Sequence, residues 1–135
     1  MLYINLRELE HANYLKQMKT LKNDPPECTG NLLAMRDSLD IFSGKWKLLI
    51  IYYLISREEE VNTFKKMQRE ITGISAKMLT KELKDLEANL LVHREKLLTK
   101  PVSVQYSITE YGKSAADIIN RLVDWGKKHR LQLMS

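Results

Sequence analysis

The chain has 135 residues, of which 44% are hydrophobic and 29% are charged, and this balance excludes a largely disordered chain. Lysine and arginine (22) outnumber aspartate and glutamate (17), which gives a net charge of +5. The single cysteine excludes an intrachain disulfide and a cysteine-built zinc site. The longest apolar run, Leu48 to Ile55, is too short for a membrane span. We therefore expect a cytoplasmic protein without a membrane partner.

The first 22 residues are predicted to form a helical arm. Leu2, Leu6 and Leu9 recur at helical spacing and share one face. Two prolines at positions 25 and 26 end this helix, because proline cannot continue one. The expected organisation is an arm over 1–24, a domain over 25–130 and a short tail over 131–135.

Two helices are predicted to follow the prolines. Thr29 is expected to cap a short helix that continues to Leu39, and Ser43-Gly44 ends it. From Lys45 to Ser56 the chain is apolar on all sides of a helix, and this pattern is typical of a central, buried helix.

The next pattern is that of a helix-turn-helix. Thr63 can cap a short helix, Thr72-Gly73 can form the turn, and Ser75 can open a second helix that runs to Asn89. In the second helix, leucines at 4-3-4 spacing face the core and lysines lie nearly opposite them. The leucines are Leu79, Leu83, Leu86 and Leu90, and the lysines are Lys77, Lys81 and Lys84.

A hairpin and a last helix complete the domain. Leu91–Arg94 and Val102–Ile108 favour strands, with a polar tip between them. Thr109 is expected to cap a helix that ends near His129 and repeats apolar residues close to a heptad seam. The order of elements predicts a mainly α fold with a small β wing, a winged helix-turn-helix that is dimeric through its terminal helices. The predicted dimer interface contains Ile118, Leu122 and Trp125.

Basic side chains on three of these elements point to DNA. The second helix can lie in a major groove, the first can cross the phosphate backbone, and the wing can reach a minor groove or flanking phosphates. A merely solvated charged surface is the alternative, but it explains one basic helix better than three converging basic elements. The predicted DNA contacts are Lys65, Lys66, Ser75, Lys77, Met78, Thr80, Lys81, Lys84, Lys96 and Lys100.

Several short motifs are similar to those of one known family. They are Gly44-Lys45-Trp46-Lys47-Leu48-Leu49-Ile50, Phe64-x-x-Met67-x-x-x-Ile71-x-Gly73-Ile74-Ser75-x-Lys77-Met78-Leu79-Thr80, Val104-Gln105-Tyr106-Ser107-Ile108-Thr109-x-x-Gly112 and Trp125-Gly126. Over roughly residues 28–129 the chain resembles the HxlR-type regulators, relatives of the MarR winged-helix proteins. The resemblance implies a dimeric bacterial transcription regulator. The long arm and the wing tip without arginine depart from the family pattern.

Cys28 is the predicted regulatory residue. It lies at a predicted helix start, where unpaired N–H groups and the helix dipole favour a thiolate. The resemblance adds that the family often has a cysteine here, which in some members senses oxidants or electrophiles. With one thiol per chain, a sensor needs an intersubunit disulfide or an external thiol. An inert, packed cysteine is the alternative, and the inducer, a small molecule or an electrophile, stays open.

No catalytic, cofactor or metal site is predicted. The sequence has no nucleophile elbow, glycine-rich phosphate loop or HExxH helix, and its three histidines lack ligand spacing. The leading hypothesis is a regulator, not an enzyme, that binds a palindromic operator in double-stranded DNA as a homodimer. The alternative is a winged-helix module that binds proteins and no longer binds DNA.

Overall fold

The computed structural model describes residues 9–10, 12–13, 16 and 26–135, without the side chains of 26–29. Residues 9–10, 12–13 and 16 are helical, and the remainder of the predicted arm helix lies outside the described residues. The chain divides into two compact units, Met1–Phe42 and Ser43–Ser135. The division expected from the sequence, at residues 24 and 130, stays a prediction.

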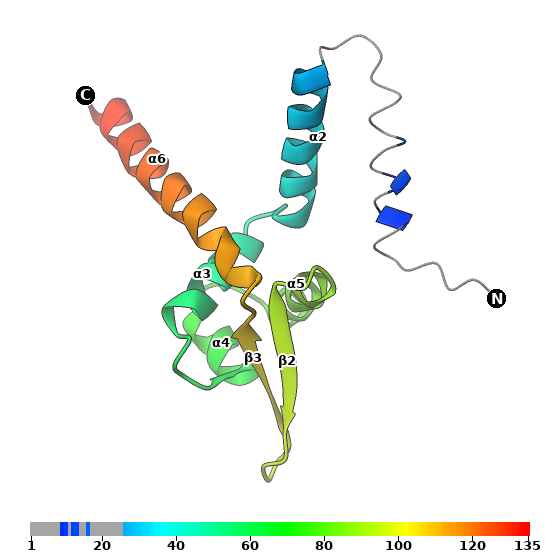
Figure 1. Cartoon of the computed structure of the whole chain (residues 1–135). Helices are drawn as coiled ribbons and strands as arrows, with labels where there is room; N and C mark the ends of the chain where they lie inside the picture. The colour runs from blue at the N-terminus through cyan, green and yellow to red at the C-terminus, as the bar shows by residue number, and fades with distance from the viewer. Residues whose placement is uncertain (1–8, 11, 14–15, 17–25) are drawn as a thin grey trace, which may run out of the picture. The chain divides into compact units, whose positions relative to one another are not determined.

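Helix α2, Pro26–Ile41, is the long helix of the first unit (Figure 1). It begins three residues before Thr29, so the prediction of a cap at Thr29 is wrong. Proline fits the first position of a helix because the N–H that it lacks would be unpaired there, and its fixed φ is already helical. Pro26 therefore starts the helix that Pro25 and Pro26 were expected only to precede.

The second unit has the architecture of a winged helix, which confirms the predicted mainly α fold with a small β wing (Figure 1), while the dimer stays a prediction. Its antiparallel sheet has the strand order β1-β3-β2. Strand β1 was not predicted, because two residues are too short to show alternation. The elements are α3 (Lys47–Ser56), β1 (Asn62–Thr63), α4 (Phe64–Glu70), α5 (Ala76–Ala88), β2 (Val92–Leu97), β3 (Ser103–Ile108), the 3-10 helix η1 (Gly112–Ala115) and α6 (Ala116–Met134).

The core lies where α3, α4, α5 and the base of the sheet meet. Ile50 and Leu54 of α3 are completely buried, as is Met67 of α4. The prediction that α3 is buried on all sides is wrong, because Leu49 is 47% exposed and Tyr52 is 52% exposed. The flank that carries them borders a hollow of about 460 Å³ against α6.

A charged cluster joins α3 to α4. The Tyr53 hydroxyl donates to Glu70 Oε2, and the Arg57 guanidinium lies 4.0 Å from the centre of the Tyr53 ring. The hydrogen bond from Tyr53 holds the pKa of Glu70 below its ordinary value. Burial and the same hydrogen bond raise the pKa of Tyr53. The cluster thus fixes the first helix of the helix-turn-helix against the central helix.

The junction between β3 and α6 is tight. Thr109 Oγ1 donates to the Leu90 carbonyl (2.7 Å) and accepts from the Gly112 N–H (2.8 Å). The prediction that Thr109 caps the last helix is wrong, because η1 intervenes and the N-cap of α6 is Ala115. A Cβ atom on Gly112 would lie 2.2 Å from the Leu91 carbonyl oxygen, so only glycine fits there. Beyond η1, α6 continues to Met134, past its predicted end near His129, because no residue before Met134 breaks it.

No helix in the described residues is both long enough and apolar enough to cross a bilayer.

Candidate nucleic-acid interface

Two capped helices and a glycine turn form the helix-turn-helix, as predicted. Thr63 Oγ1 accepts from the Lys66 N–H at 3.2 Å, and Ser75 Oγ accepts from the Met78 N–H at 3.1 Å. These side chains satisfy N–H groups that the first turns of α4 and α5 leave unpaired. Gly73 sits between the helices with φ +87°, a backbone conformation that favours glycine.

Helix α5 separates an apolar side from a basic side. Leu79, Leu83 and Leu86 are at most 1% exposed. Leu90, the fourth member of the predicted stripe, is instead 50% exposed with φ +65°, because the helix ends at Ala88. On the outer side, the structure places the predicted contacts as expected: Lys77, Lys81, Lys84, Ser75 and Thr80 are exposed, and Met78 is half-buried.

A buried ion pair anchors α5 to α3. Lys47 Nζ lies 2.7 Å from Glu82 Oε2 and 3.3 Å from Asp85 Oδ2, and the side chains of Lys47 and Glu82 are each only 6% exposed. Burial alone would lower the pKa of Lys47, but its hydrogen bonds to Glu82 and Asp85 outweigh burial and raise it. Lys47 therefore stays charged and ties Glu82 and Asp85 of α5 to α3, while Lys81 lies 3.8 Å from the other oxygen of Glu82.

The two predicted contacts on α4 differ in their surroundings. Lys66 Nζ lies 3.5 Å from Glu60 Oε1 and 3.4 Å from Asn62 Oδ1, and its side chain is 21% exposed. Lys65 is exposed and has no ion-pair partner among the described residues. Lys65 can therefore meet an anion without giving up an existing contact.

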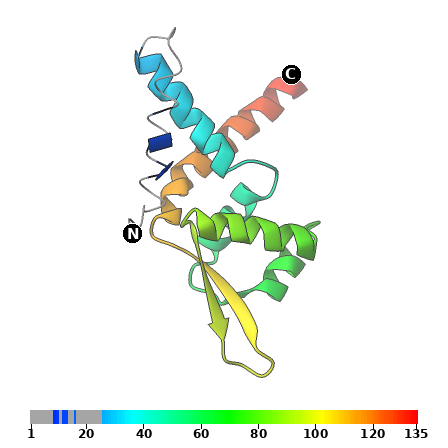
Figure 2. The same cartoon turned by 90° about the vertical axis from the view of Figure 1, so that its right-hand side faces the viewer.

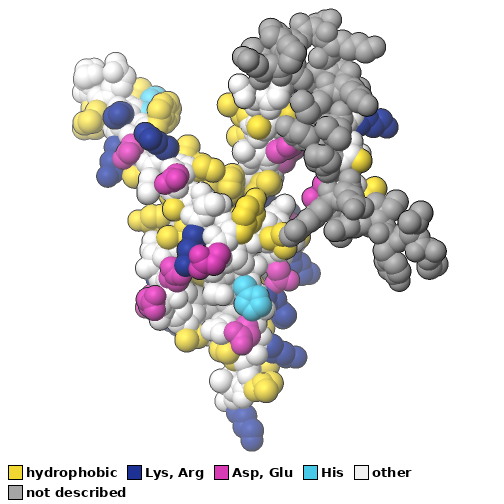
Figure 3. Space-filling view, in the orientation of Figure 1, with side chains coloured by type: hydrophobic (Ala, Val, Ile, Leu, Met, Phe, Trp, Pro, Cys, Tyr) yellow, Lys and Arg dark blue, Asp and Glu magenta, His cyan; other side chains and the backbone are white. Residues whose placement is uncertain are grey.

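The wing extends the basic surface away from the core. In Figure 2 the β2–β3 hairpin projects beside α5, and in Figure 3 lysine and arginine side chains follow this edge down to the hairpin tip. Lys96 on β2 and Lys100 at the tip are both exposed. The structure thus brings the predicted contacts of α5 and the wing onto neighbouring elements of one unit.

Arg94 is a basic residue of this surface that the sequence pattern did not single out. It is exposed on β2, pairs with Tyr106 across the sheet, and lines a hollow of about 350 Å³ together with Lys84 of α5. The sequence does carry a signal for it. Val92, Arg94 and Lys96 are two residues apart along β2, and Val92 is 2% exposed. Residues at that spacing share one face of a strand.

The predicted dimer seam on α6 is exposed in the single chain. Ile118 is 42% exposed, Leu122 is 50% exposed and Trp125 is 64% exposed. The Trp125 ring stacks on His129 with 4.9 Å between ring centres. Leu122 also borders the hollow beside α3. Exposed apolar side chains in one row are typical of interaction surfaces, and the dimer seam itself stays a prediction.

Cys28 lies in the first turn of α2. This placement agrees with the expected position near a helix start, and its side chain is outside the described part of the structure. Across the described ranges, no group of three or more histidine, cysteine, aspartate or glutamate side chains is arranged to hold a metal ion.

Comparison with known proteins gives the family. The model of the HxlR-like helix-turn-helix family matches residues 41–134. The chain belongs to the HxlR-like helix-turn-helix family. This membership makes it a DNA-binding protein of transcription regulation, as its motifs predicted.

Similar proteins agree with this membership. YdeP of Bacillus subtilis (strain 168), named an uncharacterized HTH-type transcriptional regulator, is 39% identical over 93 residues, which cover 69% of this chain and 70% of YdeP. The redox regulator HypR in its reduced form has a TM-score of 0.66 and 34% identity, covering 75% of this chain and 97% of HypR. The reduced form of YodB from B. subtilis has a TM-score of 0.61 and 32% identity, covering 70% and 90%.

The buried pair of this HxlR-like protein gives a stability prediction. Lys47→Met leaves the Glu82 carboxylate buried without its partner, so we expect the free energy of unfolding to fall by about 3–5 kcal/mol. The double variant Lys47→Met/Glu82→Met removes both charges at similar volume and should recover most of that loss. Urea denaturation followed by circular dichroism measures both. If Lys47→Met is as stable as the wild type, the pair does not anchor α5.

Proposed function

We propose that the protein is a homodimeric, sequence-specific regulator that reads DNA with α5. The observation that carries this proposal is the build of α5. One side is held by buried leucines and by Lys47, and the other side exposes lysines beside a basic wing. A helix fixed in this way can enter a major groove with its side chains directed at base edges.

Each basic element has a distinct role in this proposal. Lys77, Lys81 and Lys84 contact bases and nearby phosphates, with Ser75, Met78 and Thr80 beside them on α5. Lys65 and Lys66 contact the phosphate backbone, and Lys96 and Lys100 contact the flanking DNA. Two copies would read a palindromic operator in double-stranded DNA, with half-sites about 34 Å apart or a multiple of that. We propose no catalytic activity and no cofactor.

A triple substitution tests the role of α5. Changing Lys77, Lys81 and Lys84 to Ala should weaken binding to the promoter region of the protein's own gene by at least about 100-fold. The dependence of log affinity on log salt should become shallower by about 0.9 for each phosphate that the variant no longer neutralises. Fluorescence anisotropy over a salt series measures both quantities.

A matched triple variant separates position from charge. Lys127, Lys128 and Arg130 are exposed on α6, so changing them to Ala removes the same three charges away from the helix-turn-helix. This control should bind DNA nearly as the wild type does. Equal losses of affinity in the two triple variants would contradict the assignment of α5. The absence of any DNA binding by the wild type would favour the protein-binding module.

The proposed dimer pairs through α6. Ile118, Leu122 and Trp125 form an exposed apolar row on α6, beside the face through which Ile119 packs into the core. Pairing of two such rows would bury them, with about 25 cal/mol gained for each Å² of apolar surface removed from water. A homodimer would then present two copies of α5 to one face of DNA.

One substitution on α6 tests the seam. Leu122→Asp should place an unpaired charge in the interface, at a cost of several kcal/mol, so sedimentation equilibrium should show monomers and DNA affinity should collapse. Asn120→Asp adds the same charge about 200° around the helix and should remain dimeric. A dimer that survives Leu122→Asp would place the interface elsewhere, for example on the N-terminal arm.

We further propose that Cys28 responds to oxidants or electrophiles. Its position in the first turn of α2 favours the thiolate form, which is the reactive one. Two solved relatives support such chemistry by their descriptions, a redox regulator in its oxidised form and a diamide-treated YodB. Modification of Cys28 would change DNA affinity by shifting the dimer toward or away from the conformation in which both copies of α5 fit successive grooves.

A single substitution tests Cys28. Diamide and a quinone should each change the DNA affinity of the wild type at least about tenfold, which corresponds to about 1.4 kcal/mol of coupling, and should leave Cys28→Ser unchanged. Anisotropy titrations before and after treatment, with mass spectrometry of the adduct, measure the effect. If both proteins respond alike, or neither responds, Cys28 is a structural residue.

A further inference from the structure

The wing tip, residues 98–102, exposes a leucine. Leu98 is 92% exposed, more than any other large apolar side chain that the structure describes. The tip lies beyond the last residue pair of the β2–β3 ladder. Thr99 turns its hydroxyl back into the tip, where it donates to the Pro101 carbonyl at 2.8 Å and lies 3.2 Å from Ser103 Oγ. The polar side chain is thus used within the loop, while the apolar side chain beside it stays in solvent.

The charge around Leu98 suits a polyanion. No aspartate or glutamate occurs from Lys96 to the end of β3. Lys96 and Lys100 are exposed, and neither has a carboxylate partner among the residues that the structure describes. Glu95, just before them, accepts a hydrogen bond from Gln105 at 2.8 Å. Figure 3 shows hydrophobic and basic side chains together at the end of the hairpin. The wing tip therefore combines an apolar side chain with unpaired cations, and DNA is the partner that this charge attracts.

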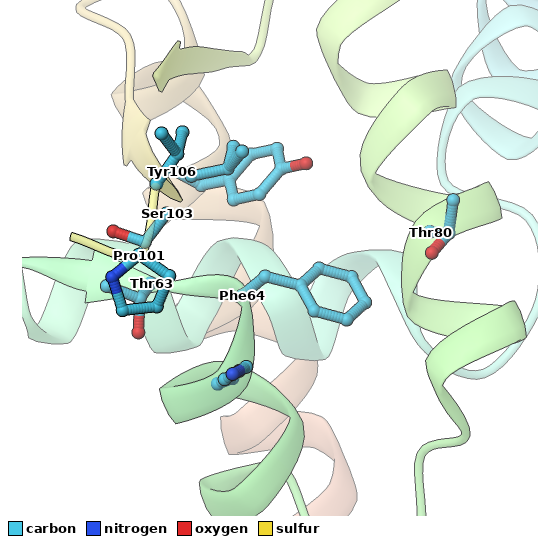
Figure 4. A pocket seen from close by; sticks show the side chains of 9 residues that line it. Thr63, Phe64, Thr80, Pro101, Ser103 and Tyr106 are labelled. Atoms are coloured by element: carbon cyan, nitrogen blue, oxygen red, sulfur yellow. The ribbon is translucent and has the colours of Figure 1, made fainter. Parts of the chain in front are cut away.

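A hollow of about 420 Å³ separates the wing from α5. Figure 4 shows the rings of Phe64 and Tyr106 extending toward α5, where Thr80 forms the opposite wall. The lining of the hollow continues to Pro101 in the wing tip. When a helix lies in the major groove, one sugar–phosphate strand separates it from the neighbouring minor groove. The hollow is the place where that strand can pass between α5 and the wing tip.

The length of the hairpin fits this arrangement. The six residues of β2 span about 20 Å at about 3.3 Å per residue. One turn of DNA rises about 34 Å, so the centre of a major groove and that of the next minor groove are about 17 Å apart along the axis. With α5 in the major groove, the wing tip can therefore reach the adjacent minor groove.

The width of that groove decides which part of the wing enters it. The minor groove is about 6 Å wide, so it admits a side chain but not a two-stranded hairpin. The ammonium groups of Lys96 and Lys100 are strongly hydrated, so they are better matched to the phosphates along the groove edges. Leu98 gives up no hydrogen bond when it leaves water, and an apolar side chain of this kind can insert into a minor groove.

We propose that Leu98 enters the minor groove beside α5 and selects A·T pairs there. Adenine carries only a hydrogen at C2 on the groove floor, whereas guanine carries its N2 amino group at that position. Leucine can pack against the hydrogen, but it leaves the amino group without an acceptor. Leu98 is then a specificity-determining residue, while Lys96 and Lys100 bind phosphates irrespective of sequence. This inference rests on the proposed function.

Inosine tests the proposal, because an I·C pair lacks the amino group but keeps the major-groove edge of G·C. Hydroxyl-radical footprints of the wild type and of Lys100→Ala, on the promoter region of the protein's own gene, locate the minor groove under the wing tip. Three versions of this fragment then carry A·T, I·C or G·C pairs at that place. By fluorescence anisotropy, the wild type should bind the G·C version at least about fivefold more weakly than the I·C version.

Three variants assign the effect to one side chain. Leu98→Ala should stay folded because the position is exposed, and it should bind the I·C and G·C versions within about twofold of each other. Lys100→Ala should bind all versions more weakly and keep the wild-type ratio. Leu133→Ala makes the same truncation at an exposed leucine of α6 and should also keep the ratio. Circular dichroism establishes that each variant is folded.

The amino group also changes the shape of the free groove, but that effect would persist in Leu98→Ala. Undiminished discrimination by folded Leu98→Ala would therefore overturn the proposal. Equal wild-type affinities for the I·C and G·C versions, loss of discrimination in Lys100→Ala instead, or no protected minor groove beside the α5 site would also overturn it. Each of these results includes DNA binding by the wild type and so leaves the proposed function standing. A wild type that binds no DNA would count against the proposed function and, with it, against this inference.

Discussion

The position of α5 depends on a lysine that the core excludes from water. Lys47 comes from the central helix α3 and meets Glu82 and Asp85 of α5. Removing two charges from water is costly, so such a pair is weak evidence for stability and better evidence for a unique arrangement. Leucines alone could let α5 rotate or slide, because apolar contacts have no direction. The ion pair sets which side of α5 faces inward, and therefore which lysines face outward.

Ion pairs neutralise several cations of the second unit, but they leave much of the proposed DNA surface without a carboxylate partner. Arg57 is paired with Glu70 of α4, Lys66 with Glu60, and Lys113 with Glu58 and Glu110. Lys77, Lys84 and Lys100 have no carboxylate partner among the residues that the structure describes. A net charge of +5 is modest for a nucleic-acid-binding protein. Local pairing therefore matters beside the total charge, because a cation that already faces a carboxylate must give up part of that contact to replace a counterion on DNA.

Local sequence signals predicted most of the second unit. Caps at Thr63 and Ser75 are read from single residues, and the leucine period of α5 indicates its buried side. Contacts between distant segments could not be read in this way. Lys47 and Glu82 lie 35 positions apart, and nothing in a lysine followed by leucines indicates that it is buried. Strand β1 exists only because β3 pairs with it.

Other differences have the same origin. The apolar pattern of α3 predicted burial on every side, but hydrophobicity does not reveal which flank borders an open hollow against α6. Arg94 could not be selected by residue type, because its role depends on the strand face that turns toward α5, and that requires the register with Tyr106. Lysines on the surface could be predicted by residue type and helical spacing, whereas the gap between the wing and α5 could not.

The junction at Thr109 and Gly112 makes α6 a lever. Thr109 joins Leu90, just past the end of α5, to Gly112 of η1, which leads directly into α6, and a side chain on Gly112 would not fit against Leu91. A tilt of α6 at this junction is carried along the helix to its far end. The 19 residues of α6 make an arm about 28 Å long, and a tilt of about 5° moves its far end by about 2.5 Å. In a dimer joined through α6, the distance between recognition helices is then set by where along this arm the two copies cross.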